Sequence, residues 1–148
     1  INGALDYKLN SNYRNLDDLL ILRPFPQIQS GEKSIKDVWT DYRQDMISKS
    51  GIAVFMFGNK IKDNEIVDSY GMLEEFDICL KNNVIPIPIG ATGSISEKLW
   101  DQVHSSIEDL YPDNKTLHAS ILKLGDSSLD NEEIIKNIII AINILQKI

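Results

Sequence analysis

The sequence contains little cysteine and histidine, and it has no long hydrophobic run. Cys79 is the single cysteine among 148 residues, which excludes an internal disulfide framework and a CxxC metal site. His104 and His118 are the only histidines, and no spacing of His, Cys and Asp suits a metal ion. No apolar run approaches the roughly 18 residues of a membrane span. The sequence therefore predicts no metal, no catalytic residues and no membrane partner.

Basic clusters are also absent. The formal net charge is -7 at pH 7, and Lys and Arg residues are isolated. A protein that neutralises many phosphates needs a basic face, so the charge excludes nucleic acid as a partner. One or two cations in a cleft still suffice for a small phosphorylated ligand. The chain has no signal peptide and begins at Ile1 rather than Met, so we interpret it as a cytoplasmic domain from the C-terminal part of a longer protein.

Other motifs of nucleotide and hydrolase chemistry are missing as well. There is no Walker A motif and no dinucleotide GxGxxG motif. Ser94 follows Gly93, but the segment lacks the second glycine of a nucleophile elbow. These absences favour binding over catalysis.

What is present indicates one α/β domain over residues 1–148. The chain is long enough for a single domain, and 43% of its residues are hydrophobic. Residues 52–57 are six apolar residues without alternation, typical of a central parallel strand buried on both faces. We expect further strands at 19–22 and 84–90. The helices that we expect cover 34–50, 71–82, a segment from 94 to 110 capped by Ser94 or Ser96, and a last helix capped by Asp130.

Polar residues follow the central strand where ligands of α/β sheets usually bind. Gly58, Asn59 and Lys60 occupy the carboxyl end of this strand, and such ends meet at one sheet edge. We interpret residues 62–68 as a mobile loop over the site. Gly71 then opens a helix. A strand, a glycine turn with a lysine and a second glycine together predict a nucleotide site.

Two charged helix residues complete this predicted site. At 100° per residue, Arg43 lies at the boundary between the apolar stripe and the solvent face of its helix, so its guanidinium can reach the rim of the sheet. Glu75 lies near the edge of the apolar stripe of the next helix, whereas Glu74 points away from it. Two cations, Arg43 and Lys60, suit a pyrophosphate, and Glu75 suits a ribose hydroxyl. Arg23, at the end of the first strand, is a second candidate for anion contact.

Two further segments have unusual patterns. Pro86 and Pro88 are two residues apart, so both missing donors face the same neighbour, and the strand lies at an edge or beside a gap. The last helix carries more isoleucine than one sheet face needs, which predicts a subunit or domain contact.

Several motifs together resemble one family along nearly the whole chain. They are Leu-Arg-Pro-Phe-Pro, Tyr-Arg-Gln-Asp-Met-Ile, Phe-Met-Phe-Gly-Asn-Lys, Gly-Met-Leu-Glu-Glu-Phe and Ile-Pro-Ile-Pro-Ile-Gly-Ala-Thr-Gly. This set is similar to the SLOG (STALD-type) sensor domains of Thoeris anti-phage defence effectors. The resemblance implies a Rossmann-like (LOG/SLOG) open parallel sheet flanked by helices. The family's first strand and glycine-rich turn are not recognisable in this chain.

The resemblance also implies a function and a binding site. Domains of this family sense a cyclic ADP-ribose isomer, with the 3′-linked type expected here, that a TIR-domain partner makes. Binding activates an attached sirtuin-like NAD-hydrolysing domain in bacterial cytoplasm, and the domains form dimers or tetramers. On this resemblance the ligand-binding residues are Arg43, Lys60, Glu75, Gly58, Asn59, Gly71, Met72, Leu73, Arg23, Phe25 and Pro26.

Two alternatives remain open at this point. The wider family includes LOG phosphoribohydrolases of nucleoside monophosphates, whose Pro-Gly-Gly-x-Gly-Thr-x-x-Glu motif is represented here only from Gly71 to Glu75. The double glycine and the threonine are absent, which favours binding. The third reading is a structural oligomerisation domain.

Overall fold

The computed structural model describes residues 20–27 and 33–147. The chain divides into two compact units, residues 1–39 and residues 40–148, which are described separately here. Helix α2 (Ile35–Ile47) crosses the boundary. It begins as predicted, because the Ser34 hydroxyl accepts a hydrogen bond from the Asp37 amide at 3.2 Å.

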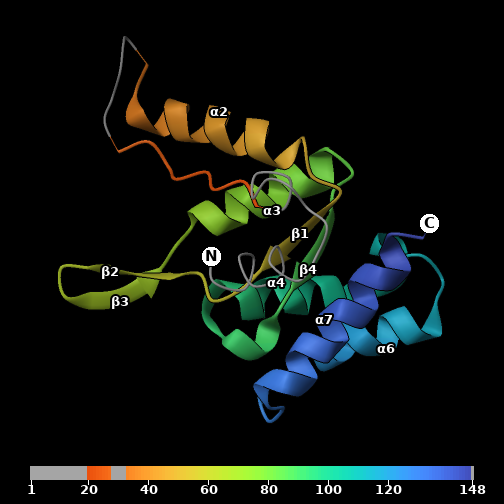
Figure 1. Ribbon diagram of the computed structural model, residues 1–148. Helices are drawn as coiled ribbons and strands as arrows, with labels where there is room; N and C mark the ends of the chain where they lie inside the picture. The colour runs from red at the N-terminus through yellow and green to blue at the C-terminus, as the bar shows by residue number, and fades with distance from the viewer. Residues whose placement is uncertain (1–19, 28–32, 148) are drawn as a thin grey trace. The chain divides into compact units, whose positions relative to one another are not determined.

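The larger unit is built on the parallel pair β1 (Ile52–Phe55) and β4 (Ile85–Pro88) (Figure 1). From β1 the chain runs through helix α3 (Gly71–Lys81) to β4, and helix α4 (Ser94–Ser105) follows β4. Both helices pack against β4, whose residues from Pro86 onward are buried. The rings of Phe55 and Phe76 meet edge to face, 5.8 Å apart, and join β1 to α3. This is the α/β, Rossmann-like arrangement that the sequence predicts.

Strand β1 differs from the prediction in its exposure. It ends at Phe55, and Val54 is 40% exposed, so it is not buried on both faces. Among the described residues it pairs only with β4. The apolar run continues through Met56 and Phe57, which are 45% and 54% exposed. An apolar run without alternation is therefore no proof of burial on both faces.

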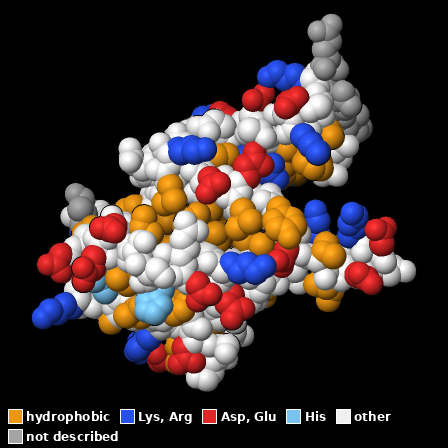
Figure 2. Space-filling model, turned by 180° about the vertical axis from the view of Figure 1, so that it is seen from behind, with side chains coloured by type: hydrophobic (Ala, Val, Ile, Leu, Met, Phe, Trp, Pro, Cys, Tyr) orange, Lys and Arg blue, Asp and Glu red, His pale blue; other side chains and the backbone are white. Residues whose placement is uncertain are grey.

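The segment after Gly58 is a β-hairpin and not the loop that the sequence suggests. Strand β2 (Asn59–Lys62) pairs antiparallel with β3 (Glu65–Asp68). Asp63 and Asn64 both have positive φ, 52° and 64°, as a two-residue type I′ turn requires. At the base, the Lys98 ammonium binds the Asp68 carboxylate at 2.6 Å. Figure 2 shows Lys, acidic and hydrophobic side chains together on this projecting hairpin.

Within the described residues, β4 pairs only with β1, in agreement with the prediction that its prolines mark an edge. The amides of Ile85 and Ile89 donate to the carbonyls of Gly51 and Phe55, at the two ends of β1. Since amides alternate along a strand, the nitrogens of Pro86 and Pro88 face away from β1. The Tyr111 hydroxyl donates to the Pro86 carbonyl on that side.

The C-terminal part adds three helices. They are α5 (Ile107–Leu110), α6 (Lys115–Lys123) and α7 (Asn131–Leu145). Helices α6 and α7 pack on each other, with Leu117 and Ala141 fully buried. The Asp130 carboxylate accepts from the Glu133 amide at 2.9 Å, which confirms the predicted cap of α7. Ile135 and Ile139 of α7 are more than half exposed.

Three further predicted features are wrong. Residues 20–22 form no strand, and Ile21 and Leu22 are 74% and 63% exposed. The long helix from 94 is interrupted at Ser106 and continues as α5. Neither Ser94 nor Ser96 caps α4, because its first turn follows Gly93 and has no side-chain cap. The buried Ser96 hydroxyl instead contacts the carbonyls of Phe55 and Ile89, both at 2.9 Å.

The predicted absence of the family's first strand and glycine-rich turn concerns residues outside the described part of the chain, and it stays a prediction. In the described part of the chain, no helix has the length and hydropathy needed to cross a membrane.

Candidate functional site

The carboxyl end of β1 lies between the first turns of two helices. A Cβ atom on Gly58 would lie 2.8 Å from Met72 Sδ of α3 and 2.7 Å from Ile95 Cβ of α4. Both distances are shorter than side chains allow, and Gly58 has a φ of 95°, so glycine is required here. Gly58 thereby brings the chain into contact with the first turns of both helices.

Neither of these helices has a side-chain cap at its start. Backbone carbonyls before the helices accept from part of the first-turn amides instead: Met72 donates to Ser69 and Ser96 donates to Phe57, both at 3.0 Å. The helix dipoles still place partial positive charge at both starts, next to one glycine, which favours an anionic ligand.

Arg43 lies over the first turn of α3 and binds two carboxylates. Its Nε donates to Glu75 Oε1 at 3.1 Å, and its Nη1 donates to Glu74 Oε2 at 2.9 Å. The Arg43 side chain is only 11% exposed. A Cβ on Gly71 would lie 2.4 Å from Arg43 Nη2, so the guanidinium can occupy this position only because residue 71 is glycine.

The two glutamates share Arg43, which the sequence did not indicate. The helical wheel directed Glu74 away from the site, yet Glu74 forms the shorter of the two ion pairs. Burial raises the pKa of Glu75, the Arg43 hydrogen bond and charge lower it, and the Glu74 charge raises it, with a net shift upward. When both carboxylates are ionised, the three side chains carry a net charge of -1.

Lys60 lies on the hairpin rather than in this cluster. It is exposed on β2, opposite Val67, and it lines an open cavity of about 570 Å³ together with Lys62 and Tyr70. Asn59 begins the same strand and is exposed. The structure therefore brings Arg43, Gly71 and Glu75 together and places Lys60 on a separate element.

The remaining predicted ligand-binding residues fall into two groups. Met72 and Leu73 are half-buried and pack against the hydrophobic core. Arg23, Phe25 and Pro26 belong to the N-terminal unit, where the Pro26 carbonyl accepts a hydrogen bond from Trp39 Nε1 at 2.7 Å. Their roles toward a ligand stay predictions.

Backbone conformation marks one further residue at this edge. Phe57 has a φ of 61°, which costs about 1 kcal/mol or more for a bulky residue. Its amide donates to Thr92 Oγ1 at 2.7 Å and its carbonyl accepts from the Ser96 amide at 3.0 Å. These two bonds fix the strained backbone while the ring stays 54% exposed. No sequence pattern indicates this conformation.

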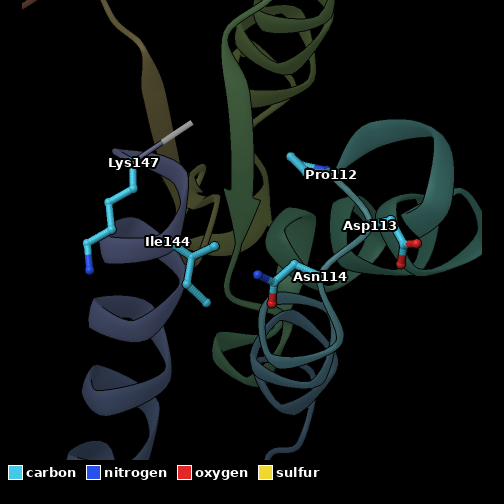
Figure 3. A pocket seen from close by; sticks show the side chains of 5 residues that line it. All are labelled: Pro112, Asp113, Asn114, Ile144 and Lys147. Atoms are coloured by element: carbon cyan, nitrogen blue, oxygen red, sulfur yellow. The ribbon is translucent and has the colours of Figure 1, made fainter.

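A second cavity, of about 400 Å³, lies away from the strand ends (Figure 3). It is formed where α6 begins and α7 ends, and Asp113 and Lys147 lie on its opposite sides. The Asn114 side chain at its wall already accepts from the amides of Thr116 and Leu117, both at 3.0 Å. The Asn114 side chain is thus already occupied as the cap of α6, and this cavity suits a charged ligand less well than the strand edge does.

Comparison with known proteins identifies the family of this chain. The family model described as "Sir2- and TIR-associating SLOG family" matches residues 1–146. The chain belongs to this SLOG family. The family's description names association with Sir2 and TIR domains.

Relatives of this SLOG domain are much longer proteins. It is 42% identical over 146 residues to NAD(+) hydrolase ThsA of Cytobacillus dafuensis, covering 99% of this chain and 30% of the relative. It is 39% identical over 147 residues to ThsA of Bacillus cereus (strain MSX-D12) and 33% identical to ThsA of Enterococcus faecium, covering 98% and 99% of this chain and again 30% of each relative. The chain thus spans about 30% of the length of these relatives.

Proposed function

We propose that this SLOG domain is a nucleotide sensor that binds a cyclic ADP-ribose isomer, of the 3′-linked type, made by a TIR-domain partner. Binding activates an attached sirtuin-like NAD-hydrolysing domain in anti-phage defence. The observation that carries the proposal is the cluster of Arg43, Glu74 and Glu75 at the start of α3, a helix whose Met72 lies against Gly58. The family's association with Sir2 and TIR domains, and the names of its relatives, support the attached output.

The pyrophosphate of such a ligand would lie at the start of α3 and α4. Several first-turn amides of these helices already donate to backbone carbonyls, such as that of Met72 to Ser69 and that of Ser96 to Phe57, so the helix dipoles and the cations, rather than a row of free amides, would attract the phosphates. Arg43 and Lys60 would supply charge-assisted hydrogen bonds, each worth roughly 1.5 to 3 kcal/mol when partly desolvated. Because Lys60 lies on the hairpin, we infer that the hairpin closes toward the ligand.

The ribose would be recognised by Glu75. This carboxylate is half-buried and binds Arg43. A phosphate that accepts a hydrogen bond from Arg43 in place of Glu75 would leave the Glu75 carboxylate able to accept a hydrogen bond from a ribose hydroxyl. Asn59, Met72 and Leu73 are assigned to the same ligand, with Arg23, Phe25 and Pro26 as further contacts. A homo-oligomer, formed through exposed isoleucines such as Ile135, would transmit the signal.

Calorimetry on the purified protein tests this assignment. We expect binding of 3′-linked cyclic ADP-ribose, and Arg43→Ala or Lys60→Ala should weaken it at least tenfold, about 1.4 kcal/mol, and flatten its salt dependence. Glu75→Gln should preserve the salt dependence but reduce discrimination between cyclic isomers. Lys136→Ala removes an exposed cation on α7 and serves as control.

The same preparation distinguishes a sensor from a hydrolase. Incubation with AMP or isopentenyl-AMP should release no free base. Ribose 5-phosphate formed above background and lost in Glu75→Gln would instead support the LOG-like activity. Absence of binding to every nucleotide tested would leave the structural oligomerisation reading.

A further inference from the structure

Of the two glutamates that bind Arg43, Glu74 also binds a further side chain. The Thr40 hydroxyl donates to Glu74 Oε1, while Glu74 Oε2 accepts from Arg43 Nη1 at 2.9 Å. Thr40 and Arg43 both belong to α2, three residues apart, and so lie on the same face of the helix. Glu74 of α3 therefore contacts two residues on successive turns of α2.

Glu75 has no comparable support in the part of the chain that the structure describes. Its carboxylate binds Arg43 Nε at 3.1 Å, and burial raises its pKa in spite of this contact. Glu75 thus has one contact where Glu74 has two, and its contact with Arg43 is the longer. The Arg43 Nε contact is therefore the less constrained of the two ion pairs.

We propose that Thr40 and Glu74 are positioning residues, which keep Arg43 over Gly71 while a phosphate displaces Glu75. This inference rests on the proposed function of the site. Nε of Arg43 passes from Glu75 to a phosphate oxygen, and no covalent bond changes. Without the Thr40 hydroxyl, Glu74 can rotate and Arg43 loses the orientation that two-point binding of an anion needs.

An isosteric pair of variants tests the role of Thr40. Thr40→Val keeps the shape and removes the donor, and we expect it to weaken binding of 3′-linked cyclic ADP-ribose about fivefold. Thr40→Ser keeps the donor and should restore the affinity. Thr116→Val, at an exposed threonine of α6, is the matched control. Since Thr40 is exposed, the thermal midpoint should change little in either variant.

A double-mutant cycle separates positioning from a general structural effect. Lysine is a point charge without the planar guanidinium fork, so Thr40→Val should have at most a twofold effect in an Arg43→Lys background. Glu74→Gln should couple to Arg43→Lys in the same sense. An equal loss in both backgrounds, or wild-type affinity of Thr40→Val, would overturn the inference. If the unmodified protein binds no pyrophosphate ligand, the proposed function itself has failed.

Discussion

The helices of the larger unit begin in two different ways. Helices α6 and α7 are capped by side chains, since Asn114 and Asp130 accept from amides of the first turn. Helices α3 and α4 have no such cap, although both begin beside Gly58. Among these four helices, the two with side-chain caps pack on each other and the two without them meet the carboxyl edge of the sheet.

The first-turn amides find different partners in the two kinds of helix start. At α6 and α7 the cap side chains accept from amides of the first turn. At α3 and α4 backbone carbonyls do this, since Met72 donates to Ser69 and Ser96 donates to Phe57. The close packing of Gly58 against Met72 and Ile95 also fixes both helix starts from the strand. We expect the following substitutions to separate the two kinds of helix start, from the largest effect to the smallest.

Gly58→Ala should destabilise the fold most. The new methyl group would meet Ile95 Cβ and Met72 Sδ at under 3 Å, on a backbone with positive φ, so we expect a loss of about 3 kcal/mol. Gly93→Ala is the control for backbone strain, because Gly93 also has positive φ but has open space around it, and a smaller loss is expected from strain alone. Urea denaturation measures both. Equal losses would show that packing at Gly58 is not critical.

Removing a cap from a packing helix should lower stability and leave binding unchanged. Asp130→Ala exposes the amides at the start of α7 and should cost about 1 kcal/mol in urea denaturation. Asp130→Asn retains an acceptor and should restore most of it. Calorimetry with 3′-linked cyclic ADP-ribose should give the wild-type affinity for both variants, and a tenfold change would break the distinction between the two classes of helix.

At Phe57 we expect glycine to be more stable than alanine. Elsewhere alanine is favoured over glycine by 0.5 to 1 kcal/mol, but the φ of 61° penalises every residue with a Cβ. Phe57→Gly should therefore be more stable than Phe57→Ala by about 0.5 to 1 kcal/mol. Thermal unfolding of the two variants decides this. The opposite order would mean that residue 57 leaves the left-handed region in solution.

The smallest effect concerns pH. The pKa of Glu75 is raised above its ordinary 4.5, mainly by burial, so the folded state holds this proton more tightly than the unfolded state does. Glu75 therefore lowers stability as the pH rises from about 4.5 through its folded pKa. Glu75→Gln should remove that decline, measured as the slope of the free energy of unfolding against pH. An unchanged slope would show that Arg43 cancels the effect of burial.

Local signals in the sequence predict much of the fold. Ser34 and Asp130 cap helices as expected, because capping depends on residues within one turn. Helix α3 starts at Gly71 as predicted. Asp63-Asn64 between two alternating segments is a hairpin signal, so the β2–β3 hairpin could also have been recognised.

Features that depend on tertiary contacts were beyond sequence reasoning. The sequence places Arg43 and Glu75 near helix stripe edges, and the structure brings them into contact, while their role toward a ligand stays a prediction. Glu74 was misjudged because a helical wheel fixes the direction of a Cβ and not the reach of a long side chain. The positive φ of Phe57 arises from Thr92 and Ser96, more than thirty residues away, and no local propensity encodes it.

The two prolines of β4 have a consequence beyond the single chain. The side of β4 away from β1 offers no amide at Pro86 or Pro88, and Tyr111 occupies the Pro86 carbonyl. An incoming strand from another molecule could not form a continuous ladder there, because both β4 residues whose nitrogens face that side are prolines. The prolines thereby keep this isoleucine-containing strand from serving as a template for intermolecular strand pairing and fibrous aggregation.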